Sequence, residues 1–250
     1  MQEGRFLKRY KRFFADIINQ DGEQVVAHVP NTGSMKGLLT PESKCRYTHV
    51  DDPKRKLKYT LQMLHTPESW VGVNTHLPNN IVYEAWKDRI LPHWQKYSFA
   101  QKEVKISDKS RIDLVFCESP LEDIKKITTK NFEELKSNTK LHFVEIKNVT
   151  LTEKDQPGVA LFPDSVTKRG QKHVDELTQL ISQGHSAEMF YLVQREDCRS
   201  FKAADHIDPV YAEKLKKAQA KGLLISAFQC QLTQEGVFMD PDFKLPILWD

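Results

Sequence analysis

Long hydrophobic runs are absent from this sequence of 250 residues. No apolar stretch approaches the roughly 20 residues that a membrane-spanning helix needs. The first ten residues, MQEGRFLKRY, place no apolar stretch after their charges, so they do not predict a secretory signal. We therefore expect no membrane partner and a cytoplasmic location.

Cysteine is also scarce. The four cysteines, at positions 45, 117, 198 and 230, lie far apart and form no C-x-x-C pair. This spacing excludes a disulfide framework and a zinc ribbon, and it favours small buried thiols in a reducing compartment. The sequence has no long low-complexity tract, and 10% of its residues are aromatic, so it predicts a folded protein.

The net charge of +3 conceals an uneven distribution. Residues 1–100 contain 15 Lys and Arg against 10 Asp and Glu, whereas residues 101–250 contain 22 against 24. A basic first part followed by a slightly acidic second part suggests a module that binds a polyanion, joined to a module of a different kind.

The first 75 residues read as short strands with turns between them. Two extended segments flank Asp21-Gly22, a dipeptide typical of a β-hairpin, and further strand-like segments follow near residues 45–50 and 59–64. We find no convincing helix in this part. Several short strands at a spacing of 10–15 residues predict a small β-barrel.

Two basic clusters in this barrel are candidates for phosphate contacts with DNA. The first cluster is interleaved with aromatic residues that either stack on bases or pack in the core, and the second is a loop. The candidate DNA-binding residues are Lys8, Arg9, Lys11 and Arg12 in the first cluster, and Lys54, Arg55, Lys56 and Lys58 in the second.

The remainder alternates between helical and strand patterns. Asn79-Asn80 can cap a helix with apolar residues at helical spacing, and Asp208-Pro209 can open another that ends at Gly222. A third helix is expected from residue 171 to Gly184. Strands are expected at residues 97–106, 111–116, 141–147, 187–193 and 223–232, with a short helix within residues 118–140.

Two of these strands place an acid among apolar residues, Asp113 in RIDLVF and Glu145 in LHFVEIK. Two carboxylates on neighbouring strands repel one another unless a cation lies between them, and oxygen ligands suit Mg²⁺ or Mn²⁺. Lys147 follows Glu145 on the same face of its strand, where it can orient an attacking water. The alternative is structural: Asp113 bonds to a nearby backbone group or Arg111, and Glu145 and Lys147 are surface neighbours.

A strand with Asp, then a strand with Glu-x-Lys, then a helix that begins with RGQKH: this order resembles the PD-(D/E)xK nuclease superfamily. The match is closer to one family within it. Six segments in order resemble the sugar fermentation stimulation protein A family of bacteria and archaea: PNTGSM at 30–35, DPKRK at 52–56, SRID at 110–113, VEIKNVT at 144–150, LFPD at 161–164 and TKRGQKH at 167–173.

This resemblance implies an α+β protein with an N-terminal OB-fold barrel, residues 1–78, and a mixed α/β, restriction-endonuclease-like domain, residues 79–250. It implies that Asp113 and Glu145 are metal-binding acids, that Lys147 is the superfamily lysine and that Gln171 is the polar helix residue of a catalytic site. Glu103 is a candidate third metal ligand. Ile112 replaces the usual proline before the first acid.

The sequence therefore predicts a non-specific DNA-binding protein with a Mg²⁺- or Mn²⁺-dependent phosphodiester-hydrolysing site. One alternative is a non-catalytic DNA-binding factor linked to maltose metabolism, as the family is described, and a second is a nuclease that acts on RNA. Whether the DNA is single- or double-stranded, and the oligomeric state, are not determined by the sequence.

Overall fold

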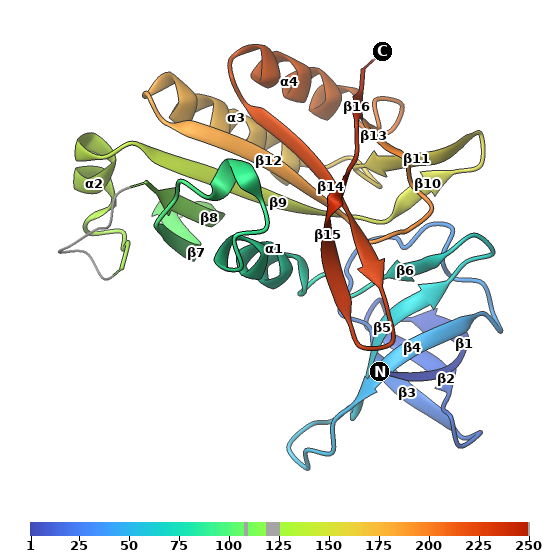
Figure 1. Ribbon diagram of the computed structural model, residues 1–250. Helices are drawn as coiled ribbons and strands as arrows, with labels where there is room; N and C mark the ends of the chain where they lie inside the picture. The colour runs from blue at the N-terminus through green and yellow to red at the C-terminus, as the bar shows by residue number, and fades with distance from the viewer. Residues whose placement is uncertain (108–109, 119–125, 250) are drawn as a thin grey trace.

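Six strands at the N-terminal end form one sheet that closes on itself (Figure 1). The structure is a computed structural model that describes residues 1–107, 110–118 and 126–249. The strand order is β3-β2-β1-β4-β5-β6, and a pairing of β3 with β5 closes the barrel. The strands are β1 (Gln2–Tyr10), β2 (Phe14–Ile18), β3 (Gln24–His28), β4 (Lys44–His49), β5 (Tyr59–His65) and β6 (Trp70–Gly72).

The barrel interior is filled by apolar side chains from alternating strand positions. Phe6, Ile17, Tyr47 and Leu61 are fully buried there, together with Met35 from the loop after β3. The Asp21-Gly22 turn joins β2 to β3, with Gly22 at a φ of +82°. The expected hairpin and the OB-fold barrel without a helix are confirmed.

The second part is built on a six-stranded sheet of order β15-β14-β12-β9-β8-β7. Strands β9, β12 and β14 run parallel, as expected for strands connected by helices, and β7, β8 and β15 are antiparallel additions. The strands are β7 (Phe99–Ser107), β8 (Ser110–Cys117), β9 (Leu141–Val149), β12 (Ser186–Val193), β14 (Leu224–Leu232) and β15 (Val237–Lys244).

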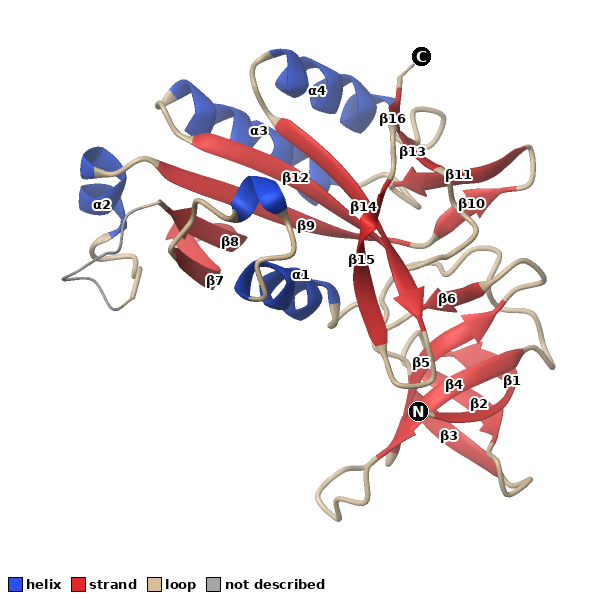
Figure 2. Cartoon of the chain, in the orientation of Figure 1, coloured by secondary structure: helices blue, strands red, loops and turns tan. Residues whose placement is uncertain are grey.

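Helices cover both faces of this sheet (Figure 2). Val174 and Leu177 of α3 and Leu215 of α4 pack in one core, whereas Val82 and Ala85 of α1 pack in the core on the opposite face. The helices are α1 (Pro78–Lys87), the short 3-10 helix η1 (Pro92–Trp94), α2 (Phe132–Asn138), α3 (Lys168–Ser182) and α4 (Pro209–Ala220). In the described part of the chain, none is long and apolar enough to cross a membrane.

A small four-stranded sheet, of order β10-β11-β13-β16, belongs to the α/β part, where Phe201 and Ala203 pack in the same core as α3 and α4. Its strands are β10 (Leu151–Glu153), β11 (Gln156–Phe162), β13 (Ser200–Ala203) and β16 (Ile247–Leu248). Contacts across the junction fix the barrel to the α/β part: the Gly72 N–H donates to the Gln194 carbonyl at 2.9 Å, and Arg46 donates to the Leu232 carbonyl at 3.1 Å.

Several boundaries differ from the sequence predictions. Helix α1 begins at Pro78, whose fixed φ suits a first turn, so Asn79 lies inside that turn and its side chain is not a cap. Asp208 does cap α4, because its side chain accepts the Tyr211 N–H at 3.0 Å. The short strands of the small sheet and β15 were not predicted, and part of the 118–140 segment, residues 119–125, lies outside the described residues.

Candidate metal and phosphate site

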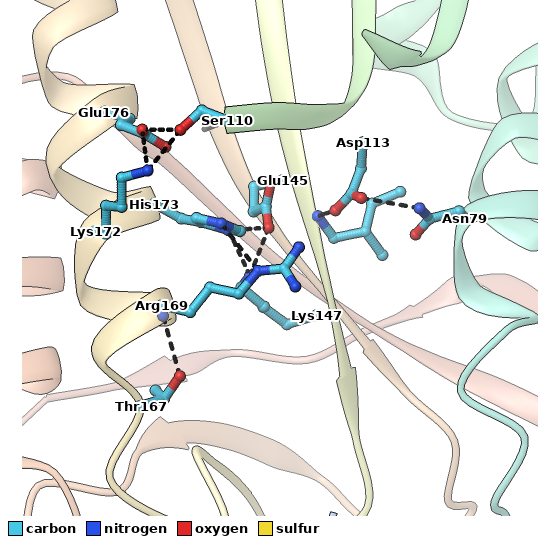
Figure 3. Close-up of polar contacts among 12 residues, drawn as sticks. Asn79, Ser110, Asp113, Glu145, Lys147, Thr167, Arg169, Lys172, His173 and Glu176 are labelled. Atoms are coloured by element: carbon cyan, nitrogen blue, oxygen red, sulfur yellow. Dashed lines mark hydrogen bonds and ion pairs between the residues drawn. The ribbon is translucent and has the colours of Figure 1, made fainter. Parts of the chain in front are cut away.

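Asp113 lies where β8 and β9 separate. The two strands pair from Cys117↔Leu141 to Leu114↔Val144, and beyond that point the edge of β9 is open toward Asp113. The Asp113 carboxylate fills this fork: Oδ2 accepts the Ile146 N–H at 2.8 Å, and Oδ1 accepts from Asn79 Nδ2 at 2.9 Å. The carboxylate is therefore held against the strand that carries Glu145 (Figure 3).

Glu145 and Lys147 lie on one face of β9, as the alternation of the strand predicts, and face α3. Lys147 Nζ is 2.6 Å from Glu145 Oε1, and it is 3.1 Å from Nδ1 of His173 on α3. The same His173 nitrogen contacts Glu145 Oε1. Glu145 and His173 are buried, and Lys147 is partly buried. The structure thus joins an acid, a lysine and a histidine at one carboxylate oxygen.

Arg169, one helical turn before His173, selects the protonation pattern of this cluster. Its Nε donates to His173 Nε2 at 3.4 Å, and a guanidinium can only donate, so Nε2 is the acceptor. In the neutral ring the proton is then on Nδ1, which donates to Glu145. Lys147 completes the arrangement as a second donor to the same oxygen.

The two acids are in different electrostatic environments. Burial raises the pKa of Asp113 to about 6, and repulsion from Glu145 adds to this rise, against the hydrogen bond from Ile146. Burial also opposes the charge of Glu145, but the Lys147 ammonium and the His173 hydrogen bond lower the pKa of Glu145 below its ordinary value. At neutral pH both groups are largely ionised, and their repulsion is only partly neutralised.

A buried oxygen without a partner shows that a cation fits here. Glu145 Oε2 is buried and makes no hydrogen bond with the described residues. An unpaired carboxylate oxygen is costly in a protein interior, whereas Mg²⁺, Mn²⁺ and Ca²⁺ are bound by such oxygens. Within the described ranges, no group of three or more His, Cys, Asp and Glu side chains is placed to hold a metal.

A cavity of about 640 Å³ opens over these residues. It is large enough for a phosphate and its hydration, and cations surround its acids: Lys102, Lys147 and Arg169 all line it. Thr75 and His76, from the segment between β6 and α1, form the wall next to the barrel. The cavity therefore combines three acids, Glu103, Asp113 and Glu145, with cations suited to a phosphate group.

The start of β8 is braced against α3, which helps to fix Asp113. Ser110 Oγ accepts from Lys172 Nζ at 2.7 Å and contacts the Glu176 carboxylate (Figure 3). Lys172 and Glu176 also form an ion pair at 3.2 Å. This contact ties the strand of the first acid to the helix that carries His173.

Two of the residues predicted for the site are not in contact with Asp113 or Glu145. Gln171 is buried, but its amide donates to both carboxylate oxygens of Asp208, at 2.8 and 3.0 Å, and it does not line the cavity. The structure does not bring this predicted catalytic residue to the acids; its side chain joins α3 to the capped start of α4. Glu103 lines the cavity wall, but it is exposed and is linked to Asp113 only through Asn79, which donates to it at 2.7 Å.

His173, Arg169 and Asn79 belong to the site and were not singled out from the sequence. Arg169 and His173 are four residues apart, a spacing that places both on one side of a helix, and both fall in the TKRGQKH segment. That spacing was the available signal. For Asn79 no such signal existed, because its role depends on where α1 begins relative to β8.

The predicted DNA-binding cations of the barrel fall into two groups. Several are engaged within the protein: Arg9 donates to the carbonyls of Asn31 and Gly33, Lys58 pairs with Asp51 at 2.6 Å, and Arg55 donates to Thr60. Lys8 lies 3.5 Å from Asp16. The side chains of Lys11, Arg12, Lys54 and Lys56 are exposed and make no hydrogen bond or ion pair with the described residues. The last four are free for a ligand, whereas Arg9 is structural.

The fold and site define a protein with an OB barrel followed by an α/β domain that presents an acid pair and a lysine. The family model for the SfsA N-terminal OB domain matches residues 7–73, and the model for the sugar fermentation stimulation protein RE domain matches residues 76–236. The chain belongs to the sugar fermentation stimulation protein family, as the sequence motifs predicted.

Curated relatives match over nearly their whole length. The sugar fermentation stimulation protein homolog of Bdellovibrio bacteriovorus is 47% identical over 247 residues, covering 95% of this chain and 93% of the relative. The homolog of Geotalea uraniireducens is 41% identical, with 92% and 90% covered. The solved structure of Pyrococcus furiosus SfsA in complex with Ca²⁺ has a TM-score of 0.79 at 22% identity and covers 99% of this chain and 96% of that chain, a likeness that shows the fold.

Proposed function

We propose that this protein binds DNA without sequence preference and hydrolyses phosphodiester bonds with a divalent metal, Mg²⁺ or Mn²⁺. The observation that carries the proposal is the unpaired, buried Oε2 of Glu145 beside Asp113, with Lys147 at the same site. A protein that only binds DNA has no need for two acids in a cavity that faces phosphates, since the acids repel the ligand.

Asp113 and Glu145 would hold the metal, together with the Ile146 carbonyl. The Ile146 N–H points to Asp113, and in a strand the carbonyl of a residue points to the same edge as its N–H. A bound metal would stabilise the negative charge that develops on the phosphate. The Pyrococcus furiosus SfsA structure is a complex with Ca²⁺, which supports a cation that prefers oxygen ligands.

The chain itself supplies the remaining functions. Lys147 Nζ donates a hydrogen bond to the attacking water and holds it in line with the phosphorus. Glu145 Oε1 accepts from that ammonium at 2.6 Å, and His173 in turn donates to the same carboxylate and holds it in place. Arg169 and Lys102 line the same cavity and pair with the phosphate oxygens.

The barrel is the proposed DNA-binding surface. Its exposed lysines, Lys54 and Lys56, lie in the loop before β5 together with Arg55. Burial lowers the pKa of His28, and the nearby charges of His76 and Arg55 lower it further. His76 also lines the acid cavity. Arg55 donates to Thr60 of β5, which pairs with His28 of β3, and one strand of DNA would contact both this loop and the cavity.

A second candidate is a DNA-binding factor without catalysis that acts in sugar metabolism. The relatives' name, sugar fermentation stimulation protein, favours it, and nuclease-like folds are also used as binding modules. The two functions differ in whether Lys147 is required.

The test is a cleavage assay with end-labelled single-stranded, duplex and branched DNA, each with Mg²⁺, Mn²⁺ or EDTA. We expect metal-dependent cleavage by the wild type and none by Asp113→Ala. Glu84→Ala is a matched control, since Glu84 is an exposed acid that pairs with Lys87 on α1. DNA binding with no cleavage in any metal would refute catalysis and favour the second candidate.

A further inference from the structure

A second, smaller pocket adjoins the acid cavity and is not used by the chemistry above. It has a volume of about 170 Å³ and lies between the loop after β3 and the small sheet, and Thr75 lines both cavities. We call it the junction pocket and define it by Thr32, Asn148, Thr150, Phe162 and Asp164. Asn148 directly follows Lys147 on β9, so the pocket begins next to the proposed catalytic lysine.

The wall that the barrel contributes is held rigidly in place. Arg9 donates to the carbonyls of Asn31, at 2.7 Å, and Gly33, at 2.9 Å, so its charge is directed into the loop. Asp164 accepts both the N–H and the hydroxyl of Ser34, at 3.2 and 3.0 Å. A side chain on Gly33 would meet these groups, because a Cβ there would lie 3.0 Å from Asp164 Oδ2. The pocket is therefore formed before any ligand binds.

The lining of the junction pocket is neutral and polar on one side and apolar on the other. The hydroxyls of Thr32 and Thr150 and the amide nitrogen of Asn148 make no hydrogen bond with the described residues. Met35 and the partly buried ring of Phe162 supply the apolar side, and Phe162 is held by Tyr191 and Tyr211 at centroid distances of 5.6 and 5.4 Å.

This chemistry differs from that of the acid cavity. Among the residues that the structure describes, no Lys or Arg lines the junction pocket and Asp164 is its one charged lining residue, so the pocket repels a phosphate. Free hydroxyl and amide groups beside an aromatic ring suit a nucleobase, which binds by neutral hydrogen bonds and stacking. The volume has room for one ring system and not for a base pair.

We propose that the junction pocket takes the base of one unpaired nucleotide in the DNA strand whose phosphate lies in the acid cavity. The inference rests on the proposed function and adds its substrate class: a strand that is single or frayed at the nucleotide next to the cleaved bond. A continuous duplex has to extrude that nucleotide first, at a cost of a few kcal/mol, and is the poorer substrate.

The test compares two ligands with the same phosphates, a 12-residue oligothymidine and a 12-residue strand of abasic sites, each titrated by fluorescence anisotropy. The variants are Thr150→Met, which fills the pocket, and Thr150→Val, which keeps the volume and removes the hydroxyl. Thr152→Met is the matched control, since Thr152 lies two residues further on β10 and lines a different cavity. Thermal melts verify that each variant is folded.

We expect the wild type to prefer oligothymidine, and we expect Thr150→Met to reduce this preference about 10-fold, the contribution of one stacked base. Thr150→Val should reduce it less, in the same direction, and Thr152→Met should leave it unchanged. An unchanged preference in both Thr150 variants, with tight binding retained, would overturn the junction pocket and leave the proposed function standing. Failure of the wild type to bind either strand would overturn the junction pocket, while cleavage of duplex DNA in the assay above would still support the proposed function.

Discussion

Replacing Asp113 by Asn should stabilise the metal-free protein at neutral pH. In the unfolded chain an aspartate has a pKa of 3.8, whereas burial and repulsion from Glu145 raise the pKa of Asp113 to about 6 in the folded protein. This difference corresponds to about 3 kcal/mol of unfolding free energy. The folded state binds the proton more tightly, so the penalty is absent below a pH of about 3.8, grows as pH rises and is complete above about 6.

Asparagine removes this penalty but keeps only part of the hydrogen bonding. Its oxygen still accepts the Ile146 N–H, whereas its NH₂ meets the NH₂ of Asn79, and we assign about 1 kcal/mol to that mismatch. The net gain for Asp113→Asn is about 2 kcal/mol at pH 7.5, and it should vanish near pH 4.5. Urea unfolding of both proteins in EDTA at the two pH values measures it.

Metal should reverse the order of stability. At a concentration about 100 times its dissociation constant, Mn²⁺ would stabilise the wild type by about 2.7 kcal/mol, because only the folded state brings both carboxylates together. Asp113→Asn should not respond. If Asp113→Asn is less stable than the wild type in EDTA by the same amount at both pH values, Asp113 is a structural hydrogen-bonding residue and the reasoning is wrong.

Three further outcomes follow from the contacts. Replacing Lys54, Arg55 and Lys56 together by Ala should reduce the slope of log binding constant against log salt concentration for duplex DNA by about 2–3. An unchanged slope in a salt titration would exclude this loop as a phosphate-binding site. His173→Ala should lower kcat about 10-fold with little change in KM. His173→Asn should recover part of this rate, because its amide can still donate to Glu145. Equal losses of kcat in both variants would contradict a positioning role. Gln171→Ala should lower the unfolding free energy by about 2 kcal/mol in urea melts and leave Mn²⁺ binding intact, and loss of Mn²⁺ binding would return this residue to the site.

Much of the architecture followed from local patterns. The strand of Asp113 and the strand of Glu145 stood out because an acid within an apolar run is costly, and β alternation placed Lys147 beside Glu145. The capped start of α4 followed from Asp208-Pro209. These features depend on residues close in sequence, where spacing alone carries the information.

The parts that were missed depend on distant pairings. Strands such as β13 and β16 are short, and their pairing is set by neighbours far along the chain. Gln171 was placed at the site by its position in a motif, but the helix turns its side chain toward Asp208, whereas His173, two residues on, meets Glu145. Arg9 reads as a phosphate ligand in a basic cluster, yet it stabilises a loop more than 20 residues away in sequence. Sequence periodicity does not report such contacts.

The most direct test of the metal site is calorimetric titration of Mn²⁺ into the wild type, Asp113→Asn and Lys147→Ala. We expect saturable binding by the wild type and loss of binding in Asp113→Asn. Lys147→Ala should still bind Mn²⁺, because the lysine positions water and is not a metal ligand, while its cleavage of DNA is abolished. A wild type that binds no Mn²⁺, or a Lys147→Ala protein that cleaves DNA as fast as the wild type, would contradict the claim that these acids and this lysine form a hydrolytic site.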